Sequence, residues 1–167
     1  MLFEAGSNRY RTTNNKMKLS YSQNLNQQAP RSPYTRLGGY SILPRLIDKC
    51  RADIMGEIGE YQTNCAIDQE FLTFAGIDYE ALRSQLEMDK TDYEVLEWIG
   101  ENAQNERSPW EISQWNQYQS QRAPAHHSES AAYFLEVLKS HNCKRGDITS
   151  WSDLLDLDDY CSFGGRA

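Results

Sequence analysis

The chain has 167 residues, of which 39% are hydrophobic, and this length suits one domain that buries its own apolar core without a metal or disulfide staple. The net charge is −7: residues 1–36 hold six basic residues and one acidic residue, so they carry +5 and the remainder carries −12. A body this acidic repels nucleic-acid phosphates, and we therefore expect no dedicated nucleic-acid binding.

The cysteines show no metal or redox pattern. Cys50, Cys65, Cys143 and Cys161 form no CxxC pair and no Cys/His group at zinc spacing. We predict free thiols in a reducing cytoplasm, with no bound metal and no cofactor. No segment approaches the run of about 20 apolar residues that spans a bilayer, so no membrane association is expected.

Residues 1–28 are predicted to form a flexible, basic, polar tail. They are rich in Asn, Gln and Ser and contain few aliphatic side chains that could offset the entropy of ordering. A single all-α domain is expected over residues 29–167.

The first predicted helix covers residues 43–55. Leu43, Leu46, Ile47 and Cys50 recur at helical spacing, and proline is favoured in the first turn, where Pro44 lies. Gly56 suits a left-handed helix end. The next stretch, around Gly59, fits either a loop or a minor β-hairpin near residues 57–63.

The later helices are predicted from their capping residues. Asp68 and Asp78 are expected to cap two short helices. The capping boxes "TDYE" at Thr91 and "SPWE" at Ser108 begin two more, and Ser150 with Asp153 begins the last. A further helix is expected over about residues 130–140. The sequence thus predicts a compact, irregular bundle of about six short helices.

Four charged residues of the first helix form the first candidate site, which contains Arg45, Asp48, Lys49 and Arg51. They fit a solvated helix face with weak ion pairs, in which Asp48 pairs with Arg45 or Arg51. If other elements cover them, guanidinium groups there would bind a carboxylate or phosphate well. Arg51 is the strongest candidate because it borders the apolar stripe, whereas Arg45 and Lys49 are assigned to the wet face.

The C-terminal segment "SWSDLLDLDDYCSFGGRA" concentrates four aspartates, and Asp153 among them is explained by capping. Their spacing does not match an EF-hand loop. We interpret the others as structural acids that meet the arginines of the first helix. Asp156 and Asp158 are the candidates to line a ligand site with them. Metal binding by these aspartates is the less favoured alternative.

Histidines and aromatic residues add no catalytic pattern. His126 and His127 lie in a stretch typical of an exposed loop. Trp110 and Trp115 are expected to bury large areas and to donate their indole N–H groups. An exposed aromatic patch would mark a partner surface. No GxSxG, P-loop, GxGxxG or HExxH motif occurs.

The order of several motifs is familiar: "RSPYTRLGGYSILPRLIDKCRA", "GEYQTNCAIDQEFLTFAGID", "LEWI", "SPWEISQWNQYQSQRAP" and the C-terminal segment quoted above. Over residues 31–167 the chain resembles a bacterial family of small proteins known as domain of unknown function 5069. The resemblance implies a recurring unit but no activity, substrate or catalytic residue.

Three hypotheses follow. The first is a small cytosolic binding or regulatory module that contacts a protein partner or a small anionic ligand. The second is an enzyme or small-molecule sensor whose polar cleft is lined by the charges of the first helix with Asp156 or Asp158. The third is a metal-dependent activity of the C-terminal aspartates.

Overall fold

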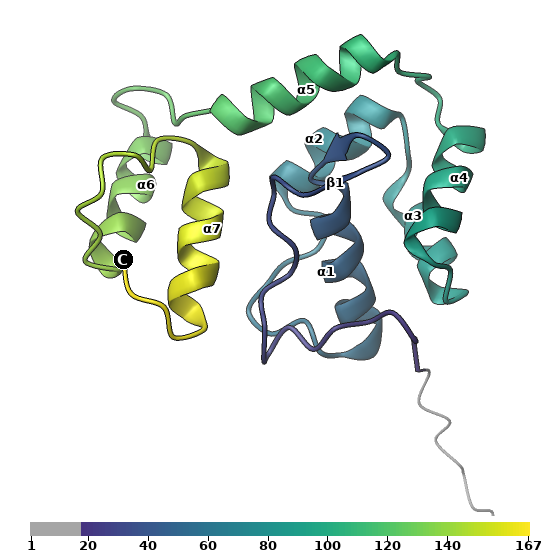
Figure 1. Ribbon diagram of the computed structural model, residues 1–167, viewed down its shortest axis with the longest axis horizontal. Helices are drawn as coiled ribbons and strands as arrows, with labels where there is room; N and C mark the ends of the chain where they lie inside the picture. The colour runs from purple at the N-terminus through teal and green to yellow at the C-terminus, as the bar shows by residue number, and fades with distance from the viewer. Residues whose placement is uncertain (1–17) are drawn as a thin grey trace, which may run out of the picture.

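A computed structural model describes residues 18–167, which contain seven α-helices and one short antiparallel hairpin (Figure 1). The elements are β1 (Arg36–Leu37), β2 (Tyr40–Ser41), α1 (Leu43–Met55), α2 (Ala66–Ala75), α3 (Tyr79–Glu87), α4 (Asp92–Asn102), α5 (Pro109–Gln121), α6 (Glu129–Ser140) and α7 (Trp151–Ser162). The predicted all-α class is confirmed, and each of the seven helical segments predicted from the sequence corresponds to a helix, so the expected total of about six was one too low. None of the helices in residues 18–167 has the length and apolar character that a membrane crossing requires.

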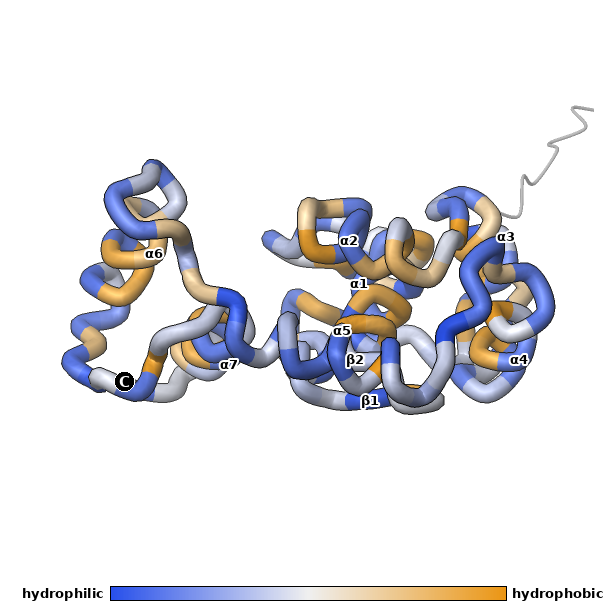
Figure 2. Tube along the Cα trace, turned by 90° about the horizontal axis from the view of Figure 1, so that it is seen from above, coloured by the Kyte–Doolittle hydropathy of each residue, from blue (hydrophilic) through white to orange (hydrophobic). Residues whose placement is uncertain are grey.

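The central helix is α1, and all of its residues from Leu43 to Ala52 are buried. It begins after Ile42, whose φ is 73°, and ends at Gly56 in the left-handed conformation, as predicted. Its apolar stripe joins side chains of α2 to α5 in one core, to which Phe71, Leu82 and Val95 contribute. Figure 2 shows apolar (orange) segments in helices α1, α2, α4 and α5.

The hairpin lies earlier in the chain than predicted. Gly38 and Gly39 form its turn with φ of 57° and 89°, as the tight turns favoured in hairpins require. A Cβ atom on Gly38 would clash with Cδ1 of Leu96, so the turn also packs closely on α4. Of the two alternatives predicted for residues 57–63, the loop is confirmed and the minor hairpin is not: Gly59 has φ 65°, and the segment forms no strand pairing.

Capping chemistry predicted most of the helix starts. The reciprocal bonds of the capping boxes occur at Thr91, Ser108 and Ser150, and Asp78 accepts a hydrogen bond from the N–H of Ala81. Asp68 is a correction. The N-cap of α2 is Cys65, and Asp68 lies at the third helical position, where its side chain binds the Cys65 N–H.

Helices α6 and α7 lie side by side at one end of the molecule (Figure 1). Phe134 of α6 packs edge-on against Trp151 of α7, with ring centroids 5.3 Å apart. Helix α5 contacts both α7 and β2 and so links this pair to the other helices.

The two tryptophans of α5 differ in their exposure to solvent. Trp115 is buried as predicted, and its indole N–H lies 3.4 Å from the Ser41 carbonyl oxygen. Trp110 is 70% exposed, contrary to prediction, because it occupies the solvent side of the first turn of α5.

The expected tail falls partly outside the described residues, which exclude 1–17. Residues 18–28, however, pack on the domain: Leu19 and Leu25 are buried, and the Leu25 N–H donates to the Glu57 carbonyl oxygen at 2.9 Å. Ser20 donates from its N–H and its hydroxyl to the Asp89 carboxylate. Two leucines and these hydrogen bonds order a segment whose composition is otherwise polar.

Candidate functional site

The four charged residues that the sequence proposed as a site are all buried, although they lie on different sides of α1. Arg45, Asp48, Lys49 and Arg51 are each only 3% exposed. The assignment of Arg45 and Lys49 to a wet face is therefore wrong. Other elements surround α1, so its polar side is covered as well as its apolar stripe.

Arg45 forms the contact with the far end of the chain. Its guanidinium donates to both carboxylate oxygens of Asp159 in α7, at 2.6 and 3.2 Å, and Asp159 is 7% exposed. The Tyr61 hydroxyl donates to the same carboxylate at 2.8 Å, and the Arg45 guanidinium lies 5.5 Å from the centroid of the Tyr61 ring. The predicted contact between the two segments exists, but Asp159 makes it instead of Asp156 or Asp158.

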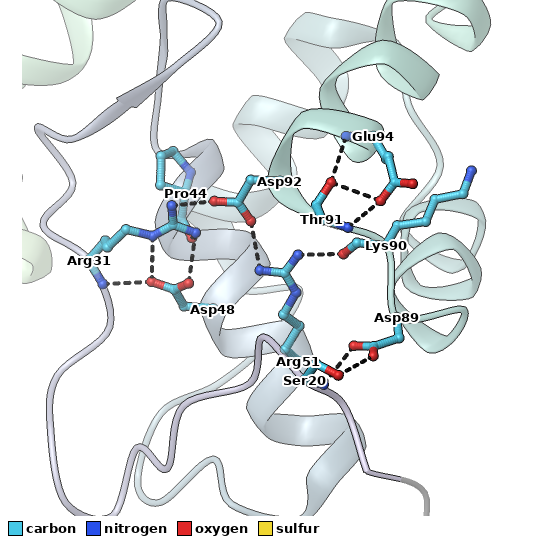
Figure 3. Close-up of polar contacts among 10 residues, drawn as sticks. All are labelled: Ser20, Arg31, Pro44, Asp48, Arg51, Asp89, Lys90, Thr91, Asp92 and Glu94. Carbon is cyan, nitrogen blue, oxygen red and sulfur yellow. Dashed lines mark hydrogen bonds and ion pairs between the residues drawn. The ribbon is translucent and has the colours of Figure 1, made fainter.

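Asp48 pairs with Arg31, which precedes the helix (Figure 3). The expected pair of Asp48 with Arg45 or Arg51 does not form. The Arg31 guanidinium donates to the two Asp48 oxygens at 2.9 and 2.8 Å, and its backbone N–H donates to the same carboxylate at 2.9 Å. The third guanidinium nitrogen of Arg31, Nη1, reaches Asp92 of α4 at 2.5 Å. Arg31 thus joins α1 to the start of α4.

The other two cations of α1 face different neighbours. Arg51 donates to Asp92 and to the Lys90 carbonyl oxygen, each at 2.7 Å (Figure 3). Lys49 donates to both oxygens of Asp68 in α2, at 2.9 and 2.7 Å, and Asp68 is fully buried. Arg51 and Lys49 are therefore both paired with carboxylates of the same chain.

Together these groups form what we term the α1 ion-pair network. Each of its cations contacts at least one of its carboxylates, and positive and negative charges balance at four each. The network contains Arg31, Arg45, Asp48, Lys49, Arg51, Asp68, Asp92 and Asp159. Because every cation is already neutralised inside the protein, a small anion would have to displace an internal carboxylate to bind here.

The remaining aspartates of α7 have separate partners. Asp153 caps the helix and accepts from the Tyr34 hydroxyl at 2.5 Å, and Asp156 accepts from the Ser32 hydroxyl at 2.8 Å. Asp158 lies 2.7 Å from Nε2 of His141. The candidates Asp156 and Asp158 are therefore not joined to the α1 charges. Within residues 18–167 no three His, Cys, Asp or Glu side chains gather as metal ligands.

The pKa values of Asp92, which belongs to the network, and of Asp156, which does not, are shifted in opposite directions. Burial alone would raise the pKa of Asp92, but hydrogen bonds and charge from Arg31 and Arg51 outweigh burial, and the pKa is lowered. Burial raises the pKa of Asp156, and the neighbouring Asp159 and Asp153 add to this against the opposing Ser32 hydrogen bond and Arg45 charge.

Two of the concave regions on the described surface combine aromatic rings with charged side chains, and sequence reasoning missed both. The first, the α2–α5 groove, has a volume of about 420 Å³. In it the rings of Phe74 and Trp115 stack with centroids 4.7 Å apart, and the Arg107 guanidinium lies 4.6 Å from the centroid of Phe74. Its lining consists of Gln69, Glu70, Thr73, Phe74, Trp115 and Tyr118.

The second region, the α7-end cavity, also has a volume of about 420 Å³. It lies where residues 25–26, the loop at 59–61 and the last turn of α7 meet, and Asp158 is the one earlier candidate residue in its wall. Its lining consists of Leu25, Asn26, Gly59, Glu60, Tyr61, Asp158, Ser162 and Phe163. The abundance of Tyr and Trp in the sequence hinted at aromatic surfaces, but no local pattern located either region.

Comparison with known proteins gives one family match. A family model described as "Domain of unknown function (DUF5069)" matches residues 27–161, a range that contains every member of the α1 ion-pair network. No curated protein matches the chain.

The Arg45–Asp159 pair offers a direct test of the network. We expect Arg45→Met to lower the free energy of unfolding by about 3–5 kcal/mol, because it leaves a buried carboxylate uncompensated. Arg45→Met combined with Asp159→Leu should be less destabilised than Arg45→Met alone, since no buried charge remains unpaired. Urea unfolding of the wild type, both single variants and the double variant measures this coupling. Additive single effects would contradict an energetically coupled pair.

The opposite pKa shifts of Asp92 and Asp156 predict opposite pH dependences. Because the folded-state pKa of Asp92 is lowered, its stabilising contribution is present above the ordinary carboxyl pKa of about 3.9 and is lost as the pH falls below it. Asp92→Asn should therefore cost more stability at about pH 7 than at about pH 3.

Because the folded-state pKa of Asp156 is raised, its ionisation lowers the free energy of unfolding as the pH rises above the ordinary carboxyl pKa. Asp156→Asn keeps an acceptor for Ser32, so it should become more stable than the wild type toward about pH 7. Unfolding curves at several pH values measure both variants, and parallel profiles for the two would contradict the assignment.

Proposed function

The chain belongs to the family described as a domain of unknown function (DUF5069), and we propose that it is a binding module that recognises a protein partner through the α2–α5 groove. The observation that carries the proposal is the stacked Phe74–Trp115 pair at the floor of an open groove, with the 55% exposed ring of Tyr118 beside it. Aromatic side chains in such settings are enriched among the residues that dominate protein interfaces.

The groove is held in shape by contacts beneath and beside it. Trp115 is buried, and Phe74 is covered on one face by Arg107, which also donates to the Phe74 carbonyl oxygen at 2.9 Å. Arg107 in turn pairs with Glu111 at 2.9 Å. A preformed aromatic floor lowers the cost of ordering on binding, which favours recognition of an inserted side chain.

The charge of the domain suggests the chemistry of the partner. Residues 37–167 carry −12, and Glu70, which lines the groove, is fixed by Arg122 and by the Gln119 amide. Such a surface attracts positively charged segments and repels acidic ones. We therefore propose a partner segment with an aromatic or aliphatic anchor next to Lys or Arg residues.

The alternatives receive less support. An enzyme or sensor with an Arg/Asp/Lys cleft needs cations that face a ligand, whereas Arg45, Lys49 and Arg51 face carboxylates of the same chain. A small anionic ligand would likewise have to compete with these internal carboxylates for the cations.

The four cysteines form no disulfide, which supports a proposed location in the reducing cytoplasm.

Selection of displayed random peptides on the purified protein tests the groove. We expect the selected peptides to share an aromatic or aliphatic anchor and flanking basic residues, and to bind Tyr118→Ala about tenfold more weakly than the wild type. Tyr93→Ala is the matched control, because Tyr93 is 65% exposed on α4 and lies outside the groove. Affinities are measured by fluorescence anisotropy. Acidic consensus peptides, or peptides that bind Tyr118→Ala as tightly as the wild type, would refute the proposal.

A further inference from the structure

The α7-end cavity differs in its chemistry from the α2–α5 groove. We infer that it is a binding site for a small organic cation with an apolar body. The inference rests on the shape of the cavity, the sign of its charges and its two aromatic rings, and it is independent of the proposed protein partner because the two sites share no lining residue.

Backbone contacts build the cavity wall. The Leu25 N–H donates to the Glu57 carbonyl oxygen at 2.9 Å, which fixes residues 25–26 against the loop that follows α1. Gly59 adopts φ 65°, and a Cβ atom there would lie 2.9 Å from the Leu25 carbonyl oxygen. Only glycine permits this close approach without strain. A cavity of about 420 Å³ lies within the range of roughly 300–1,000 Å³ that small-molecule sites occupy.

Two carboxylates, Glu60 and Asp158, line the cavity from different walls. Asp158 is oriented by Nε2 of His141 at 2.7 Å, and its side chain remains 50% exposed. Glu60 is exposed, and it forms no ion pair with any residue in the range 18–167. No Lys or Arg lines the cavity. A cation is therefore attracted, and an anion repelled, by the walls themselves.

Arg45 of the network contacts Tyr61 in the cavity wall, but its guanidinium is already paired with Asp159. The Arg45 guanidinium lies against the Tyr61 ring and is neutralised by Asp159. Asp159 also accepts a hydrogen bond from the Tyr61 hydroxyl. This arrangement fixes the Tyr61 ring in the wall and uses its hydroxyl internally. Burial and the hydrogen bond to Asp159 raise the pKa of Tyr61, so the phenol stays neutral at physiological pH.

The aromatic rings suit the same class of ligand. Tyr61 and Phe163 both line the cavity, and Phe163 is 40% exposed. Aromatic faces attract ammonium and guanidinium groups and also pack against the apolar body of a ligand. Carboxylates and aromatic rings together favour a primary amine or guanidine that carries an aromatic or aliphatic group.

Three probes with one aromatic body separate charge from shape: phenethylamine, which is a cation, 2-phenylethanol, which is neutral, and phenylacetate, which is an anion. Binding of each to the full chain at neutral pH is followed by changes in protein NMR spectra. We expect phenethylamine to bind with millimolar affinity, about tenfold more tightly than phenylacetate, and to shift resonances of residues 59–61 and 158–163.

The double variant Glu60→Gln with Asp158→Asn should weaken phenethylamine binding about five- to tenfold and leave 2-phenylethanol binding unchanged. Glu97→Gln with Glu101→Gln removes the same charge from the exposed side of α4 and is the matched control. Circular dichroism melting curves verify that each variant is folded.

Three outcomes would overturn the inference. They are no saturable phenethylamine binding up to about 20 mM, equal binding of phenethylamine and phenylacetate, and equal losses in the double variant and its α4 control. None of these outcomes bears on the α2–α5 groove, whose test uses Tyr118→Ala and peptides.

Discussion

The structure depends on a central helix that is buried on every side while it carries four charges in seven residues. Arg45, Asp48, Lys49 and Arg51 would each cost several kcal/mol to desolvate alone, so the helix can occupy the centre only if oppositely charged groups meet it there. Their partners come from the segment before the hairpin, from α2, from α4 and from α7. Each of these four parts of the chain thus contributes a charged group at one fixed position along α1.

This arrangement favours specificity of assembly more than net stability. Apolar packing does not distinguish strongly between small shifts of one helix along another, whereas a buried guanidinium without its carboxylate is strongly destabilising. We therefore interpret the network as the feature that fixes how α7 and the residue 31–34 segment dock on α1. Tyr34 and Ser32, which bind Asp153 and Asp156, extend the same contact along one side of α7. Because these charges are used internally, we propose the α2–α5 groove and the α7-end cavity, and not the α1 ion-pair network, as the recognition sites.

The sequence predicted the features that depend on neighbouring residues. Capping boxes at Thr91, Ser108 and Ser150 are local, and so is the end of α1 at Gly56, and these predictions are confirmed. The burial of Arg45 could not be predicted, because a helical wheel shows which side of α1 is polar but not whether another element covers that side.

Errors in the candidate site have the same origin. Arg31 is not among the predicted site residues, yet it pairs with Asp48, and the contact across 114 residues goes to Asp159 instead of its neighbours Asp156 and Asp158. Choosing among adjacent aspartates requires the rotation of α7 about its axis, which long-range packing decides. The tight Gly38–Gly39 turn was present in the sequence, but its flanking strands have two residues each, too few to show alternation.

The central claim, that each α1 charge docks one particular element, is tested most directly by hydrogen exchange measured by mass spectrometry on Asp159→Asn and Asp68→Asn. The account predicts faster exchange in α6 and α7 for Asp159→Asn and faster exchange in α2 for Asp68→Asn, because each change leaves a different α1 cation unpaired. The same exchange pattern in both variants, or no local change in either, would contradict it.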